Sequence, residues 1–166
     1  MPSTAEAETL YTPARGLIDA GVFIGALLAG DPRHAEARLL VEQARRGDLP
    51  ACTTAGILSE VYGALTWERA QPRHDPGEAA QAVRLLVESP SDIMVLNEGL
   101  EVALRALELA ARHGLVARRI HDARHAATAL GAGVRSVYTY DLDDWTVFEA
   151  DGVTVIGPPT ILARRS

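Results

Sequence analysis

Short apolar segments alternate with helix-length stretches along this 166-residue chain, and this alternation constrains its fold more than any other feature. We expect strands at residues 16–18, 49–53, 93–96 and 134–140, with a fifth candidate at 153–156. Helices are expected at residues 20–29, 31–46, 54–69, 77–88, 98–113 and 120–130. Strands that are joined through helices favour a parallel sheet buried on both faces. The pattern therefore predicts an α/β domain.

Two polar residues mark the expected starts of helices. Asp31 comes directly before Pro32, a pair typical of an N-cap followed by the first helical residue. Asn97 stands in the same place before the helix at 98–113. We expect the side chain of each to accept a hydrogen bond from the first turn of its helix.

The length fits a single domain, because 166 residues would not easily fill two hydrophobic cores. Residues 1–13 are small, polar and interrupted by proline, so we expect a leader there. The folded domain is expected at residues 14–157, and a tail at residues 158–166.

The charged residues and the cysteine exclude several kinds of site. Acidic residues outnumber basic ones by 22 to 16, giving a net charge of −6, so the chain as a whole is not a polybasic nucleic-acid binder. All 16 basic residues are arginine, which excludes a Schiff-base lysine and the lysine of a P-loop. Cys52 is the only cysteine, so neither an internal disulfide nor a paired-cysteine metal site can form.

Three features indicate a cytoplasmic location. A single cysteine suits a reducing compartment. Glu6 and Glu8 make the first residues acidic, unlike the basic start of a secretory signal. The longest apolar run, at residues 20–30, is about half of what a membrane-spanning helix needs. We therefore expect no association with membranes.

Two aspartates directly follow apolar strands. Asp19 follows the strand at 16–18, and Asp141 follows the strand at 134–140. Ligands of a parallel sheet bind beyond the carboxyl ends of its strands, so both carboxylates would face one crevice if these two strands are neighbours. The alternative interpretation is that each aspartate only caps the helix that follows it.

Two further acids lie at the edges of apolar helix faces. At about 100° per residue, Glu60 lies next to Ile57 and Ala64, at the border of the buried stripe of its helix. Asp122 lies next to Ala126 in the first turn of its helix, where the helix dipole favours an anion. The alternatives are a solvated rim position for Glu60 and a capping role for Asp122.

Four carboxylates in one crevice would repel one another, and some would become protonated. A divalent cation removes that repulsion, and an oxygen-only ligand set is typical of Mg²⁺ or Mn²⁺ sites. Such a site can activate water and orient a phosphodiester for in-line attack. If the cluster exists, Asp19→Asn should leave the metal-free protein equally or more stable, whereas loss of a helix cap would cost roughly 1 kcal/mol.

Four segments resemble the PIN domain, and most closely the VapC-type ribonuclease toxins of bacterial toxin–antitoxin pairs. They are residues 17–20 (LIDA), residues 57–61 (ILSEV), residues 120–123 (IHDA) with Ala126 and Ala127, and residues 137–141 (VYTYD). The resemblance covers about residues 15–156 and rests on the order and spacing of these segments together. It implies a three-layer α/β/α fold with a mainly parallel central sheet.

The resemblance also implies an activity and its residues. Asp19, Glu60, Asp122 and Asp141 match the catalytic acids that hold Mg²⁺ or Mn²⁺ in a metal-dependent endoribonuclease. The expected products carry 5′-phosphate and 3′-hydroxyl ends. Implied partners are an RNA substrate, a second copy of the chain in a homodimer, and a cognate antitoxin whose arginines would enter the acidic crevice.

Residues just before and after Asp141 complete the match to the family. Thr139 matches a hydroxyl residue that usually stands two positions before the last acid, and we count it among the substrate-binding residues. The family often adds a further metal-binding acid after Asp141, where this chain has both Asp143 and Asp144. We favour Asp144 because it adjoins Trp145, whose burial would turn the chain inward.

Basic residues surround Asp122, as an RNA-binding site would require. They are Arg118, Arg119, His121, Arg124 and His125. The helical repeat places His121, Arg124 and His125 on the exposed side of the helix. Arginine can bind phosphate through two hydrogen bonds, so Arg118, Arg119, Arg124 and His121 are candidates for contacting the substrate. The alternative is a solvated face that balances nearby acids.

Three other functions would use some of the same residues. His121 and His125 have the spacing of a zinc-protease helix, although the acid between them is an aspartate and no third ligand is evident. Asp141 and Asp143 resemble the paired aspartates of haloacid-dehalogenase-like phosphatases, but Trp145 stands where that motif needs Thr or Val. A non-catalytic protein-binding module on the same fold would not need all four acids intact.

Overall fold

The computed structural model describes residues 14–165, so the leader expected at 1–13 lies outside the described residues. The described strands form one five-stranded sheet. They are β1 (Gly16–Ile18), β2 (Ala51–Thr54), β3 (Met94–Leu96), β4 (Ser136–Tyr138) and β5 (Thr154–Gly157). Every pair of neighbours is parallel, in the order β3-β2-β1-β4-β5, which confirms the parallel sheet.

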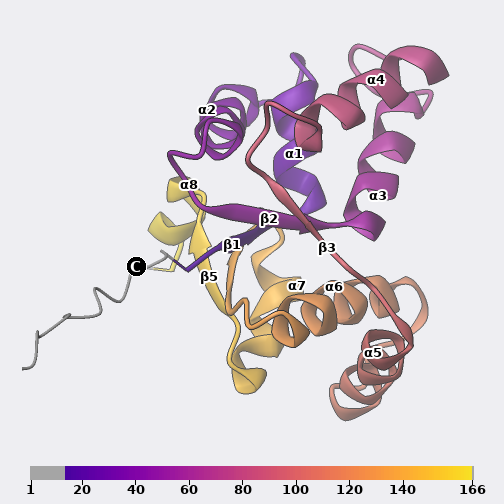
Figure 1. Ribbon diagram of the computed structural model, residues 1–166, viewed down its shortest axis with the longest axis vertical. Coiled ribbons are helices and arrows are strands. Elements are labelled where there is room, and N and C mark those ends of the chain that lie inside the picture. The colour runs from indigo at the N-terminus through magenta and orange to yellow at the C-terminus, as the bar shows by residue number, and fades with distance from the viewer. Residues whose placement is uncertain (1–13, 166) are drawn as a thin grey trace, which may run out of the picture.

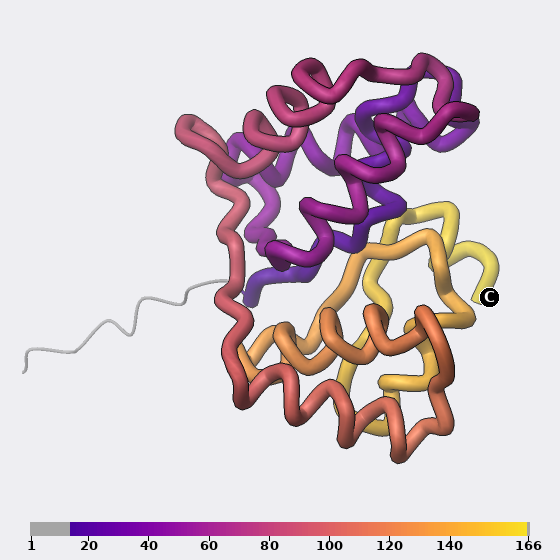
Figure 2. Tube along the Cα trace, turned by 90° about the vertical axis from the view of Figure 1, so that its right-hand side faces the viewer, coloured from indigo at the N-terminus to yellow at the C-terminus, as the bar shows by residue number. Residues whose placement is uncertain are grey.

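Helices cover both faces of the sheet (Figure 1). One side carries α1 (Ala20–Leu27), α2 (His34–Arg45), α3 (Ala55–Thr66) and α4 (Pro76–Val87). The other side carries α5 (Leu100–Arg112), α6 (Ile120–Gly131) and α7 (Leu142–Thr146). Figure 2 shows α5 running beside α6 at the outer edge of this side. The predicted three-layer α/β/α arrangement is confirmed. Across residues 14–165, no helix is both long and apolar enough to cross a membrane.

Four short elements near the site and the C-terminal end were not predicted. Besides α7, they are the 3₁₀ helices η1 (Ala117–Arg119) and η2 (Val147–Asp151) and the helix α8 (Pro159–Ala163). The helix α8 lies within the segment that we expected to be a tail, and its Ile161 is buried. The folded part of the chain therefore extends beyond residue 157.

Two helices start later than their capping residues suggest. The helix α2 begins at His34, because the Asp31 carboxylate binds the backbone N–H and the guanidinium of Arg33 instead of capping the helix. The helix α5 begins at Leu100, with Gly99 at the N-cap, so Asn97 does not cap it. Both differences are local and leave the order of elements as predicted.

The strand β1 lies at the centre of the sheet, and its position determines where the acidic site forms. Leu17 and Ile18 are fully buried. Gly16 allows the neighbouring strand to approach, because a Cβ at this position would lie 2.5 Å from Cε2 of Tyr138. Ile18 is paired with Tyr138 of β4, so the residues that follow these two strands leave the sheet side by side.

Candidate active site

Asp19 lies directly after β1, and both oxygens of its carboxylate accept hydrogen bonds. Oδ1 accepts one from the backbone N–H of Ala20 at 2.9 Å, so Asp19 does cap α1. Oδ2 accepts two, from Thr139 Oγ1 at 2.7 Å and from Trp145 Nε1 at 2.9 Å. Only 7% of Asp19 is exposed. Burial raises the pKa of Asp19, whereas these hydrogen bonds and the nearby His125 oppose the rise.

Thr139 joins the two strand ends. Its hydroxyl donates to Asp19 and accepts a hydrogen bond from the backbone N–H of Asp141 at 3.0 Å. Thr139 is fully buried, so it is not accessible to a substrate. The role that we expected for Thr139 is therefore corrected from substrate binding to positioning of the two aspartates.

Asp141 follows β4, beside Asp19, but has a different environment. It is exposed, and its carboxylate accepts no hydrogen bond from any residue between 14 and 165. It therefore does not cap α7 through its side chain, contrary to the alternative interpretation. Partial removal from water raises the pKa of Asp141, the charges of Asp144 and Glu60 raise it further, and Arg33 opposes the rise.

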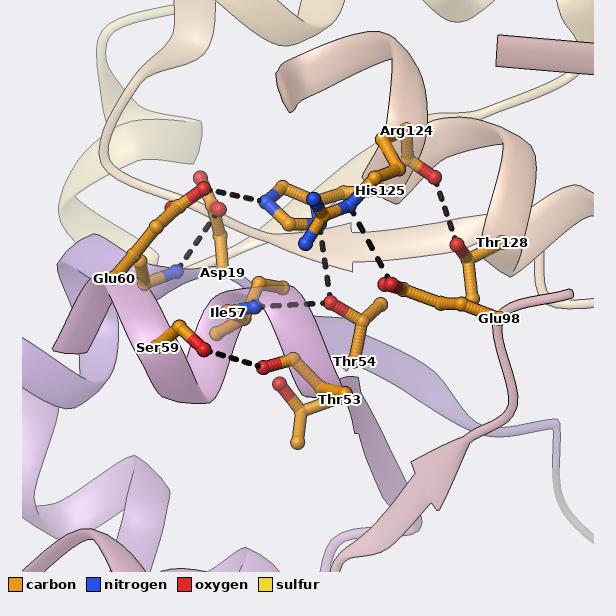
Figure 3. Close-up of polar contacts among 12 residues, drawn as sticks. Asp19, Thr53, Thr54, Ile57, Ser59, Glu60, Glu98, Arg124, His125 and Thr128 are labelled. Carbon is orange, nitrogen blue, oxygen red and sulfur yellow. Dashed lines mark hydrogen bonds and ion pairs between the residues drawn. The ribbon is translucent and has the colours of Figure 1, made fainter. Parts of the chain in front are cut away.

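Glu60 reaches the site from α3, where it meets His125 of α6 (Figure 3). Glu60 Oε1 lies 2.8 Å from His125 Nε2, and His125 Nδ1 lies 3.0 Å from Thr54 Oγ1. Thr54 also caps α3 by accepting a hydrogen bond from the backbone N–H of Ile57 at 3.1 Å. His125 is only 1% exposed, so the predicted exposed position is wrong. The helix α6 packs against α5 and also contacts α3, and His125 faces Thr54 and Glu60.

Asp122 lies in the first turn of α6 and is paired with Arg119 of η1. Arg119 Nε donates to Asp122 Oδ2 at 3.2 Å. The same guanidinium donates to the backbone oxygen of Asp144 at 2.9 Å and lies 3.4 Å from its carboxylate. Burial raises the pKa of Asp122, the hydrogen bond from Arg119 opposes that rise, and the charge of Asp144 adds to it. Asp143 is exposed and raises the pKa of neither Asp122 nor Asp141.

Asp144 interacts electrostatically with Asp122 and Asp141, and Glu60 does so with Asp141. The acids offer an oxygen-only set of donors, which suits Mg²⁺ or Mn²⁺. Asp144 raises the pKa of both Asp122 and Asp141, so like charges do oppose one another here. Within residues 14–165, no three acidic, histidine or cysteine side chains converge closely enough to hold an ion as they stand. The chemistry of the donors fits a divalent cation, and binding would have to draw the carboxylates together.

The basic residues near Asp122 differ in their accessibility. Arg118 and His121 are exposed. Arg124 Nε lies 3.4 Å from Glu98 Oε2, and its guanidinium occupies the space that a side chain at Gly56 would need. Because His121 is exposed and both ring nitrogens of the buried His125 have partners, these two histidines do not form the zinc pair considered from their spacing.

An open hollow lies beside the acids, with a volume of about 440 Å³. It is lined by Tyr140, Asp141, Leu142, Asp143, Asp144 and Arg164. One contact below this hollow was missed from the sequence, namely the hydrogen bond from Trp145 to Asp19. A signal for it existed, because a buried tryptophan usually needs an acceptor for its indole N–H.

Comparisons with known proteins agree with this architecture. The model of the PIN domain family matches residues 16–148. Among solved structures, the sarcin–ricin loop cleaving toxin VapC20 of Mycobacterium tuberculosis is 21% identical, with a TM-score of 0.63 over 86% of this chain and 98% of that one. VapBC-5 of the same organism, a member of the VapBC family of toxin–antitoxin systems, is 22% identical, with a TM-score of 0.55 over 88% of this chain and 100% of that one.

A third similar structure is DNA-bound VapBC from Salmonella typhimurium. It is 19% identical, with a TM-score of 0.55 over 86% of this chain and 97% of that one. At these identities the likeness shows a shared fold. A comparison with curated proteins found no match.

Proposed function

This chain belongs to the PIN domain family, and we propose that it is a metal-dependent endoribonuclease, the toxin of a type II toxin–antitoxin pair. Domains of the VapC kind are typically nucleases. The match to the PIN domain family argues against the alternative of a haloacid-dehalogenase-like phosphatase. The observation that carries the proposal is the group of carboxylates around the hydrogen bond between Thr139 and Asp19. A protein that used this fold only for binding would have no need to retain such a repulsive group.

Asp19, Glu60, Asp122 and Asp141 would hold the Mg²⁺ or Mn²⁺, with Asp144 as a fifth acid. A divalent cation bound there supplies a water of lowered pKa and stabilises negative charge on a phosphodiester. The chain itself fixes Asp19 through Thr139 and Trp145. The expected products carry 5′-phosphate and 3′-hydroxyl ends.

Four basic residues are proposed to bind the RNA. Arg118 and His121 are exposed next to Asp122 and are ready to contact phosphate. Arg119 and Arg124 are engaged with carboxylates and would exchange these partners for phosphate. The hollow of about 440 Å³ beside Asp141 gives the chain space to admit a nucleotide.

A cognate antitoxin and a homodimer complete the proposal, which places the protein in the cytoplasm. Similar solved structures include members of VapBC toxin–antitoxin systems, two of them bound to DNA. The helix α5 presents Leu100, Leu104 and Leu107 to solvent, with exposed fractions of 75%, 52% and 59%. An apolar row of this kind on one helix face is typical of a protein interface, and it supports pairing through this side.

Cleavage of single-stranded or looped RNA by the purified protein tests the activity. We expect cutting with Mg²⁺ or Mn²⁺ and none after chelation, and the products should be ligatable at their 5′-phosphate and 3′-hydroxyl ends without prior enzymatic treatment. Asp141→Asn serves as the inactive control. Cutting that continues in excess chelator would refute a metal-dependent nuclease. A protein that binds its partner but never cuts RNA would support the binding module instead.

Asp144→Asn and Asp143→Asn form a matched pair that tests the fifth acid. Asp144 contacts Arg119 and shifts the pKa of Asp122 and Asp141, whereas Asp143 does neither. We therefore expect Asp144→Asn to lower the cleavage rate about tenfold or more and Asp143→Asn to change it little. Rates measured at saturating and at limiting Mn²⁺ would check this. Equal, small losses in both variants would leave a site of four acids.

A further inference from the structure

The one hydrogen bond of the Glu60 side chain goes to a buried histidine. Glu60 lies on α3 with 39% of its side chain exposed, and within residues 14–165 only His125 hydrogen-bonds its carboxylate. No other hydrogen bond or ion pair in the described part of the chain holds this carboxylate. Figure 3 shows the His125 ring between Glu60 on one side and Thr54 on the other. The direction of the Glu60 carboxylate therefore depends on His125.

The ring of His125 is itself held rigidly. It is 1% exposed, and a Cβ added at Gly56 would lie 3.0 Å from its Cε1, so backbone closely covers the ring edge. Its Nδ1 meets Thr54 Oγ1, whose other interaction is with the backbone N–H of Ile57 at the start of α3. The same threonine thus begins the helix that carries Glu60 and orients the ring that Glu60 contacts.

The hydrogen-bonding pattern assigns the proton that faces Glu60. Thr54 Oγ1 already accepts from Ile57, and its single hydroxyl hydrogen can be donated to Nδ1. A neutral ring that accepts at Nδ1 carries its proton on Nε2, and a charged ring carries protons on both nitrogens. An ionised carboxylate can only accept. In either form of the ring, Nε2–H of His125 donates to Glu60 Oε1.

We infer that His125 is the positioning residue for Glu60, holding this carboxylate toward Asp19, Asp122 and Asp141. This inference rests on the proposed function, since it treats Glu60 as a metal ligand. Partners that orient a metal-binding carboxylate typically change metal affinity or activity by 10–100-fold when removed. His125 contacts neither metal nor RNA in this role and acts through Glu60 alone.

Mn²⁺ affinity of the intact chain, measured by calorimetry or by the electron paramagnetic resonance of free Mn²⁺, tests the inference without any cleavage. We expect His125→Leu and His125→Asn to weaken Mn²⁺ binding by about 10–100-fold. His125→Gln should restore most of the affinity, because the amide nitrogen of glutamine can replace Nε2 as the donor. The side chain of asparagine is one methylene shorter, so its amide nitrogen does not reach Glu60. A merely structural role would give no such difference between Gln and Asn.

A double-mutant cycle with Glu60→Gln then shows whether the effect passes through Glu60. In the Glu60→Gln background, His125→Leu should cause no further loss of Mn²⁺ affinity. His113→Leu is the matched control for loss of a partly buried histidine that pairs with an acid, because His113 is 12% exposed, pairs with Asp151 at 2.5 Å and contacts none of the proposed ligands. It should lower the melting temperature but leave Mn²⁺ affinity unchanged.

The outcomes separate this inference from the proposed function. Wild-type Mn²⁺ affinity in folded His125→Leu, or additive losses in the cycle, would overturn the inference while metal-dependent cleavage could still stand. The expected affinities in a protein that cuts no RNA would support the inference and overturn the nuclease. A wild type that binds no Mn²⁺ at all would overturn the inference, because Glu60 would then not be a ligand.

Discussion

The carboxylate at the end of β1 accepts three hydrogen bonds, whereas the carboxylate at the end of the adjacent β4 accepts none from residues 14–165. Asp19 is buried and Asp141 is exposed, yet the pKa of each is raised. For Asp19 the cause is burial, and hydrogen bonds oppose it. For Asp141, like charges add to the partial loss of water. Two proposed ligands of one metal therefore differ in how the protein holds them. Asp19 is buried and fixed by hydrogen bonds, whereas Asp141 is exposed and its carboxylate has no such bonds to the described residues.

The largest effect on stability is expected from Asp19→Asn. The new amide cannot accept from Thr139, Trp145 and Ala20 with the geometry of a carboxylate, so at least one buried donor loses its partner. We expect the metal-free protein to lose about 1–3 kcal/mol of unfolding free energy, together with all cleavage. Urea unfolding in chelator measures this. Charge repulsion alone predicted that this variant would be equally or more stable than the wild type, and the hydrogen bonds reverse that prediction. A variant as stable as the wild type would support the prediction from charge repulsion instead.

Thr139→Val should have the next largest effect, because it removes the hydroxyl that links the Asp19 carboxylate to the backbone of Asp141. Valine keeps the shape but neither donates to Asp19 nor accepts from the backbone of Asp141. We expect a loss of about 1–2 kcal/mol and weaker cleavage. Thr139→Ser, which keeps the hydroxyl, should remain close to the wild type in both. If valine is tolerated as well as serine, the hydroxyl does not couple Asp19 to Asp141.

Asp141→Asn should abolish cleavage with little effect on stability. It removes a charge that is repelled by Asp144 and Glu60 and breaks no hydrogen bond of the side chain. The residue is exposed, so the gain in unfolding free energy should not exceed about 0.5 kcal/mol. Thermal unfolding in chelator, beside Asp19→Asn, gives the direct contrast. If Asp141→Asn lost more than about 1 kcal/mol of unfolding free energy, Asp141 would contribute to stability as Asp19 does, and the contrast would fail.

The smallest expected effect is a difference in pH dependence. A raised pKa in the folded protein means that Asp19, Asp122 and Asp141 favour folding fully below about pH 4, and that this contribution is lost as pH rises through the raised values. The metal-free wild type should therefore melt at a lower temperature at pH 7 than at pH 5. Asp141→Asn should reduce this difference by about 1 °C. A melting temperature that rises between pH 5 and pH 7 would contradict the argument.

Local patterns in the sequence were enough to place the acids on their elements. Glu60 and Asp122 lie at the borders of apolar helix faces, and Asp19 and Asp141 follow strands, because helical and strand repeats are properties of neighbouring residues. The pairing of β1 with β4 joins segments about 120 positions apart, so no local pattern could establish it. The resemblance to a known family supplied that part of the prediction.

His125 shows why the remainder of the site was not predictable in the same way. The prediction that His125 is exposed assumes a helix with a single buried face. The helix α6 instead has its buried residues distributed around much of its surface, and these are Ala123, His125, Ala126, Ala127, Thr128, Ala129 and Leu130. Many of them are small, which suits close contact on two sides. The partner of a buried histidine depends on which helices meet in space, and that is not encoded in the helix itself.

The hydrogen bonds on Asp19 also have a consequence for the synthesis of this protein. Its two side-chain donors, Thr139 and Trp145, stand 120 and 126 positions later in the chain. A ribosome that has made Asp19 must add 120 further residues before this carboxylate can meet the nearer of the two donors, and a similar number before β4 is available as a neighbour. A nascent chain that ends before Thr139 and Trp145 therefore lacks both side-chain donors of Asp19. The strand order therefore delays assembly of the proposed RNA-cutting site until the ribosome has also made β4 and Trp145.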